Sequence, residues 1–325
     1  MLYVGSQKVG KVIIPLMVGE LQGFDREVSA QGVYQMPTSS FTFSLPSNAI
    51  DVGTNGMASA FQDCTGLTSV DLSSLTTVSG NNGAQYAFYG CTGLTSVDLS
   101  SLTTVSGSSG MASAFRGCTG LTGALNLSSL TTVSGNNGAQ YAFQGCTGLT
   151  SVDLSSLTTV SSSSGMSSAF QGCTGLTGAL DLSSLIIVSG SSGMSYAFSS
   201  CKNLTSVDLS SLTTISGSSG IYFAFYNCTE LTSVDLSSLT TVSGSSAMQY
   251  AFYNCTSLKS LSFPALTSTS FGSYTNQFNK MLQGVTGCTV HFPSNLQSVI
   301  GSWSDVTAGF GGTNTTVLFD LPATT

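Results

Sequence analysis

Apolar residues recur at fixed spacings through most of this chain, with Ser, Thr and Gly filling the positions between them. In one stretch the apolar positions are Leu67, Val70, Leu72, Leu75, Val78, Ala84, Ala87, Phe88 and Cys91. A single unit of this kind is too short to bury its apolar side chains alone. We therefore expect successive units to stack into a solenoid in which each coil covers its neighbours.

The motif Phe-x-x-Cys gives the length of the repeat. It ends at Cys64, Cys91, Cys118, Cys146, Cys173, Cys201, Cys228 and Cys255, in steps of 27 or 28 residues. The motif predicts eight coils. Each of the two longer steps contains one inserted residue, within Gly123 to Leu125 and within Gly178 to Leu180, and an insertion of this kind in a strand predicts a β-bulge.

Each coil is expected to contain one strand, at Thr68 to Leu72 and its equivalents, and these strands would pair in a parallel sheet. At a strand spacing of about 4.8 Å, eight coils form a rod of roughly 40 Å. The segment before each Cys is predicted to be a short helical turn. The Gly-rich and Ser-rich segments supply turns, and they lack the G-x-x-x-x-G-K pattern of a phosphate-binding loop.

The motifs Ala-Phe-x-x-Cys and Leu-x-x-Val-x-Leu resemble BspA-type leucine-rich repeats, a family of bacterial, protist and phage-associated surface proteins. The resemblance implies a β-rich leucine-rich-repeat solenoid over residues 51–262. This chain departs from the family at Ser73 and Ser100, where the family has Pro, and in its longer Gly-Ser loop. Pro264 keeps the family form.

Both ends are expected to be atypical, because an end coil without a cap would expose core side chains and strand edges to water. Residues 1–50 are predicted to be a strand-rich cap or attachment segment, since Leu2 to Val9 resembles short strands at the start of prophage tail-associated proteins. Residues 263–325 are predicted to be a carboxy-terminal cap. Gly287 to Leu296 and Trp303 to Asp305 resemble the closing segment of BspA-type proteins.

Composition narrows the possible partners. The chain has a net charge of −7 with seven basic residues, so clustered cations for a nucleic-acid backbone are lacking. Although charged residues are only 6% of the chain, 41% are hydrophobic, which favours a packed core over disorder. The apolar stretch Val12 to Val18 contains Pro15 and is too short for a membrane span or a signal peptide.

The residues also argue against catalysis and bound cofactors. Nine cysteines fall without a C-x-x-C pair, and the single histidine, His291, lies outside their column, so we expect packing thiols and no zinc site. The motif G-x-S-x-G of a nucleophile elbow is absent. His291 is expected to be a cap residue, and the chain is predicted not to be an enzyme and to need no cofactor.

One polar column recurs on the predicted strands and points away from the core. It consists of Asp71, Asp98, Asn126, Asp153, Asp181, Asp208 and Asp235. Carboxylates at strand spacing repel one another, and bound calcium would compensate for that repulsion. The favoured interpretation is a solvated polar ladder, with a calcium site as the weaker alternative.

A second column lies in the turn before each Cys, where Phe is constant and its neighbours vary. The predicted ligand-binding residues are Tyr86, Tyr89, Arg116, Tyr141, Gln144, Tyr196, Tyr222, Tyr226, Tyr250 and Tyr253. Tyr provides rigid amphipathic contact area at low entropic cost, and its ring can stack on sugars. The alternative is that these aromatic residues only cover that side of the coil.

Together these patterns predict a non-catalytic adhesion or recognition protein on a virion or a bacterial cell surface. The favoured hypothesis is a phage or prophage tail component that binds a protein or glycan on a host cell. The alternatives are a bacterial BspA-like adhesin and a purely structural fibre or decoration subunit. Partners would include virion or fibre neighbours and further copies of the chain, but neither nucleic acid nor a membrane interior.

Overall fold

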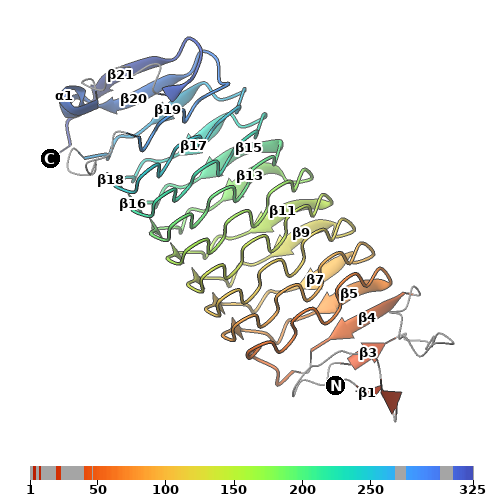
Figure 1. Ribbon diagram of the computed structural model, residues 1–325. Coiled ribbons are helices and arrows are strands. Elements are labelled where there is room, and N and C mark those ends of the chain that lie inside the picture. The colour runs from red at the N-terminus through yellow and green to blue at the C-terminus, as the bar shows by residue number, and fades with distance from the viewer. Residues whose placement is uncertain are drawn as a thin grey trace.

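The computed structural model of the chain describes residues 3–4, 7–8, 20–22, 40–45, 47–267, 276–300 and 310–324. The segment Trp303 to Asp305, predicted to belong to the cap, lies outside these ranges. Figure 1 shows one rod of stacked coils, with β4 near one end and β21 near the other. The predicted architecture, a solenoid of coils stacked through parallel strands, is confirmed.

The longer strand of each coil forms one column along the rod. Its strands are β4 (Phe41–Ser44), β5 (Leu67–Asp71), β7 (Ser96–Asp98), β9 (Gly123–Asn126), β11 (Leu149–Asp153), β13 (Thr177–Asp181), β15 (Asn203–Asp208), β17 (Ser233–Asp235), β19 (Ser260–Ser262), β20 (Thr289–Pro293) and β21 (Thr316–Leu321). They pair in parallel in four groups, with interruptions after β7, β11 and β17. In register, Val70 lies beside Val97 and Asp71 beside Asp98, so like residues stack on like residues.

A second column of two-residue strands follows the turn after each long strand. It is a seven-stranded parallel sheet of β6 (Thr77–Val78), β8 (Thr104–Val105), β10 (Thr132–Val133), β12 (Thr159–Val160), β14 (Ile187–Val188), β16 (Thr214–Ile215) and β18 (Thr241–Val242). In each pair the second residue is buried and the first is partly exposed. The alternation follows from the two-residue period of a strand.

The rod has about ten turns, so the prediction of eight was too low. β4 pairs with β5, and the coil that β4 begins contains the first Phe-x-x-Cys, which ends at Cys64. β20 and β21 continue the stack beyond β19, although these coils lack the motif. β3 (Glu20–Gln22) pairs antiparallel with β4, and β1 (Tyr3–Val4) with β2 (Gln7–Lys8). The short helices η2 (Ser294–Leu296) and α1 (Gln297–Ile300) follow β20. At about 4.8 Å per coil the rod is roughly 50 Å long.

The two predicted bulges are not found on the inserted strands: the residue skipped in the pairing is Thr150 of β11 and Thr205 of β15, on the partner strands. The inserted strands β9 and β13 instead begin new groups, since neither pairs with the coil before it. The pairing of β9 with β11 shifts register between Leu149 and Ser151, and that of β13 with β15 shifts between Gly178 and Ala179. The inserted glycines, Gly123 and Gly178, have φ values of 77° and 74°. Glycine has no Cβ and adopts this left-handed backbone at low cost. A third register shift, between Phe41 and Thr42 where β4 pairs with β5, occurs without an insertion.

The segment before each Cys is not a helical turn, and that prediction was wrong. It is a chain of β-turns in which every fourth residue has positive φ, as at Asn82, Tyr86 and Gly90. Backbone donors alternate: the N–H of Tyr86 bonds to Ala112 O in the next coil, whereas that of Ala87 bonds back to Ala84 O. Pairing between coils therefore replaces the hydrogen bonds of a helix.

The core is one continuous cluster of stacked columns. From Phe61 to Phe252, the phenylalanines of adjacent coils have ring centroids 5.0 to 5.8 Å apart and planes within 11° of parallel. The Leu, Val and Cys columns beside them are almost wholly buried. Each coil thus covers the apolar side of the next, which is the reason that the repeat folds only as an array.

Candidate functional site

The turn segments place a stripe of aromatic side chains on one side of the rod. We call this surface the tyrosine face and define it by the outward residues of segments 82–90, 109–117, 137–145, 164–172, 192–200, 219–227, 246–254 and 276–284. Residues three apart share this face, and the ring centroids of Tyr86 and Tyr89 are 5.9 Å apart. The cause is one β-turn, because the Tyr89 N–H donates to Tyr86 O.

Four of the predicted residues gather near the amino-terminal half of the tyrosine face. The Arg116 guanidinium lies 5.3 Å from the ring centroid of Tyr141 and 5.9 Å from that of Tyr89. Tyr86 is the most exposed tyrosine of the face, at 39%. Gln144 lies one coil further on and bonds through its side chain to that of Gln171, which makes it part of an amide ladder.

The other five predicted tyrosines gather near the carboxy-terminal half, around Phe223. Tyr196, Phe223 and Tyr250 form a column of parallel rings, with centroids 5.0 and 4.4 Å apart. The Tyr222 ring meets all three edge-on, between 4.6 and 5.8 Å. Four of the five tyrosines, all except Tyr222, border a surface hollow of about 490 Å³.

We call this hollow the aromatic hollow. Its lining residues are Tyr196, Phe223, Tyr226, Tyr250, Tyr253, Lys280 and Gln283. The sequence prediction missed Lys280 and Gln283 because the repeat lengthens after Cys255 and the Phe-x-x-Cys motif is lost. Pairing of the Tyr250 N–H with Asn279 O places Lys280 in the column of Tyr250, with its Nζ 5.9 Å from that ring centroid.

The middle positions of the turn segments have a backbone conformation that is unfavourable for aromatic residues. Three positions have positive φ in each turn segment from Asn55 to Asn254, and Lys280 and Gly284 do in the last segment; the outer positions hold only Asn, Asp, Ser or Gly. The middle position holds Tyr86, Tyr141, Tyr196, Phe223, Tyr250 and Lys280, besides Ser in other coils. Bulky residues are uncommon in this conformation. Of the three positive-φ columns, only the middle one therefore carries bulky side chains, against the preference of its backbone.

Around the aromatic hollow, the backbone N–H groups of the lining residues other than Lys280 are used in hydrogen bonds between coils or within turns. The N–H of Phe223 bonds to Gln249 O, that of Tyr226 to Phe223 O, and that of Tyr253 to Tyr250 O. Burial raises the pKa of Tyr196 and Tyr222 above the ordinary value, assisted by neighbouring phenols. Both phenols therefore remain protonated at neutral pH and keep a hydroxyl donor.

The polar column on the long strands has a different role. Each Asp or Asn of this column, from Asp71 to Asp235, accepts a hydrogen bond at 2.9 to 3.0 Å from the backbone N–H two residues later, as Asp181 does from Ser183. This is an Asx turn, which ends the strand. Hydrogen bonds from the Ser73 and Ser183 hydroxyls and N–H groups hold the pKa of Asp71 and Asp181 below the ordinary value.

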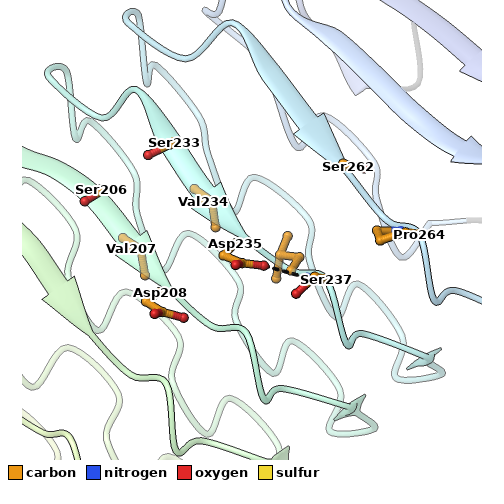
Figure 2. A pocket seen from close by; sticks show the side chains of 10 residues that line it. Ser206, Val207, Asp208, Ser233, Val234, Asp235, Ser237, Ser262 and Pro264 are labelled. Carbon is orange, nitrogen blue, oxygen red and sulfur yellow. Dashed lines mark hydrogen bonds between the residues drawn. The ribbon is translucent and has the colours of Figure 1, made fainter. Parts of the chain in front are cut away.

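The strand face also has a hollow, of about 460 Å³, where pairing between β17 and β19 is interrupted. Figure 2 shows Asp208 and Asp235 beside it, with Ser262 and Pro264 on the neighbouring coil. The Asp235 carboxylate already accepts the Ser237 N–H. No group of three or more His, Cys, Asp or Glu that could hold a metal ion occurs in the described ranges, so the calcium hypothesis gains no support here.

The cysteines are buried packing residues, as predicted. All nine are unpaired, and seven donate from Sγ to a Phe carbonyl oxygen at 2.9 to 3.3 Å. Burial raises the pKa of Cys173 and Cys228 to about 12, so the reactive thiolate is scarce. His291 lies on β20, and its Nδ1 is 3.0 Å from both carboxylate oxygens of Asp320 on β21.

Within the described ranges, no helix is long and apolar enough to cross a bilayer. The profile described as "BspA type Leucine rich repeat region" matches in six copies, over residues 33–177, 112–220 and 194–302. No curated protein matches the chain.

Three solved structures illustrate the likeness. A leucine-rich repeat protein of T. pallidum is 19% identical, with 82% of this chain and 96% of that chain covered and a TM-score of 0.38. The pneumococcal vaccine antigen PcpA is 17% identical, covering 91% and 69% with a TM-score of 0.39. A leucine-rich cell surface protein of Faecalibacterium prausnitzii is 18% identical, covering 93% and 95% with a TM-score of 0.26.

Proposed function

Because this chain belongs to the BspA-type leucine-rich repeat family, whose members are generally interaction or adhesion proteins, we propose that its tyrosine face binds a ligand on a cell surface. The observation that supports this most is the restriction of bulky residues to one positive-φ column, where Ser would fold at less cost. Selection for folding alone favours the cheaper residue. A bound partner explains why the aromatic ones are kept.

The proposed binding residues are the ten named from the sequence together with Phe223, Lys280 and Gln283. The chain works without a catalytic step or a cofactor in this proposal. Its partner is a protein or glycan at a cell surface, and several copies of the rod would engage it together, since linked copies raise avidity.

The proposed location is a phage or prophage tail, where the chain would recognise a host cell. The resemblance of Leu2 to Val9 to the start of prophage tail-associated proteins favours this location. Family membership favours the alternative, an adhesin on a bacterial surface. Both locations require the tyrosine face to be free for the ligand.

The proposal is tested by measuring binding of labelled protein to candidate host cells. The variant Tyr226→Ser/Tyr253→Ser places at both positions the residue that the repeat already has at Ser199, so the fold is preserved. We expect at least a tenfold loss of binding, because two aromatic contacts are removed. The matched control is Asp208→Asn/Asp235→Asn on the strand face, which repeats the residue that the column already has at Asn126, and it should bind as the parent does.

Unchanged binding by the tyrosine variant would contradict the proposal, and loss in the control alone would move the site to the strand face. The structural-fibre alternative is distinguished by sedimentation. If the tyrosine variant dissociates an oligomer of the parent chain, then the tyrosine face is a subunit contact and not a receptor site.

A further inference from the structure

Charge is divided unequally between the two sides of the rod. The turn segments from residue 82 to residue 284 contain two cations, Arg116 and Lys280, and no Asp or Glu. The strand column contains six carboxylates. Asp63 lies in the turn segment before this range, at one end of the column, so in a chain of net charge −7 the surface from residue 82 to residue 284 is free of carboxylates and slightly positive, which favours an anionic ligand over a cationic one.

The groups that favour an anionic ligand lie together at the aromatic hollow. Lys280 is exposed, and it forms no ion pair within the described part of the chain. The rings of Tyr196, Phe223 and Tyr250 lie face to face, so they cover one another's faces and turn their edges outward. The edge of an aromatic ring is the positive part of its quadrupole. Ring edges, phenol hydroxyls and one ammonium together form a surface for an acceptor-rich anion.

The type of anion follows from the available donors. A peptide is commonly recognised through its backbone by a free strand edge, but the backbone N–H groups of the lining residues other than Lys280 bond to other coils or turns. The side-chain donors left for a ligand are the hydroxyls of Tyr226 and Tyr253, the Gln283 amide and the Lys280 ammonium, since the Tyr196 hydroxyl bonds to Tyr222. These groups match sugar hydroxyls and a carboxylate, and the volume of about 490 Å³ suits a small ligand.

We propose that the aromatic hollow binds an acidic sugar, a glycan residue bearing a carboxylate, with Lys280 as the residue that pairs with that carboxylate. This inference rests on the proposed function of the tyrosine face and names its ligand class. The phenols and Gln283 hydrogen-bond to the sugar hydroxyls. The ammonium provides the charge-assisted bond that separates acidic from neutral sugars.

The test compares 3′-sialyllactose with lactose by calorimetric or NMR titration of the full chain. We expect sialyllactose to bind at least tenfold more tightly, the size of effect expected for one charge-assisted hydrogen bond. Lys280→Gln should abolish this preference and Lys280→Arg should retain it. Lys202→Gln removes the same charge from the corner before β15, outside the hollow, and should leave the preference intact.

Equal binding of the two sugars, or an undiminished preference in Lys280→Gln, would overturn the proposal. So would equally tight competition by a tetraglutamate peptide, because the hollow would then recognise charge alone. The outcomes separate from those above: if Tyr226→Ser/Tyr253→Ser loses cell binding while sialyllactose fails to bind, the recognition face stands and the acidic-sugar assignment falls.

Discussion

The strand face and the tyrosine face are built from the same coils but use their side chains in opposite ways. On the strand face, Asp recurs in almost every coil, and its carboxylate accepts the N–H two residues later. On the tyrosine face the residue changes from coil to coil, and its side chain points to solvent or to a neighbouring ring. The Asp column is nearly constant because its side chain completes a backbone hydrogen bond in each coil. The outward residues of the turn segments have no such backbone role, so they can vary from coil to coil.

The two faces also differ in what the backbone allows. The Asp column lies at strand ends, where an Asx turn suits Asp and Asn equally. The middle column of the tyrosine face has positive φ in every coil, so each aromatic residue there is held against its backbone preference. Predictions that separate folding from recognition follow from this contrast.

The largest expected effect is at the glycine column that joins the faces. A Cβ on Gly217 would lie 2.1 Å from Gly190 O of the previous coil. We expect Gly217→Ala to lower the free energy of unfolding by about 2 to 3 kcal/mol, because the coils must separate. Urea unfolding measures this. Gly53→Ala, which has no atom within 4 Å of the added Cβ, is the control and should cost nothing.

A smaller decrease in the free energy of unfolding is expected for a substitution on the strand face. Asp181→Ala removes the acceptor of the Ser183 N–H and should cost about 1 kcal/mol, whereas Asp181→Asn keeps that acceptor and should cost less. Because the pKa of Asp181 is lowered by folding, its contribution is present at neutral pH and is lost as the pH falls from about 4 through the lower folded pKa.

Urea unfolding of Asp181→Ala and of the parent, at pH 7 and at pH 2, tests this dependence. The difference between the two proteins should shrink at the lower pH. A difference that grows on acidification would mean that the carboxylate does not stabilise the turn.

On the tyrosine face, a substitution is expected to increase the free energy of unfolding instead of lowering it. Tyr86 is exposed and has φ 54°, so Tyr86→Asn should raise the free energy of unfolding by about 0.5 to 1 kcal/mol, since Asn tolerates this backbone. Tyr89→Asn, at a position without positive φ, is the matched control. A loss of stability in Tyr86→Asn comparable to that of the control would show that ring packing outweighs the backbone strain.

The smallest expected effect is that of a chelator. If the Asp column serves turns alone, EDTA should leave the melting temperature of the parent chain unchanged. A fall of several degrees that calcium reverses would revive the calcium hypothesis for Asp71, Asp98, Asp153, Asp181, Asp208 and Asp235. Differential scanning calorimetry at neutral pH provides the measurement.

Much of the fold was predictable because each core column is fixed by residue type. Phe88, Leu94 and Cys91 and their equivalents are buried as their spacing indicated. The conformation of the turn segments was not predictable, since apolar residues spaced three and four apart occur both in a helix and in a chain of β-turns. The sequence did contain one indication of β-turns: Asn82 and Gly90 are residue types that tolerate positive φ, and both have it in the structure.

The candidate site was predicted only in part. The tyrosines could be named from their column, but Lys280 lies 30 residues after Tyr250, outside the 27-residue or 28-residue period, and only pairing between coils aligns the two. The division into residues 1–50, 51–262 and 263–325 stays a prediction, although the strand stack extends into both end segments.

The repeat, the core columns and the residues that face outward could be derived from the amino-acid pattern, because burial and backbone preference act within one coil and its neighbours. The tertiary structure alone decided that the tyrosines form two clusters, that their rings cover one another's faces, and that a lysine ends the larger cluster. Those properties depend on which side chains meet across coils. Contacts between side chains of different coils depend on how whole coils stack, and the order of residues along the chain does not specify them.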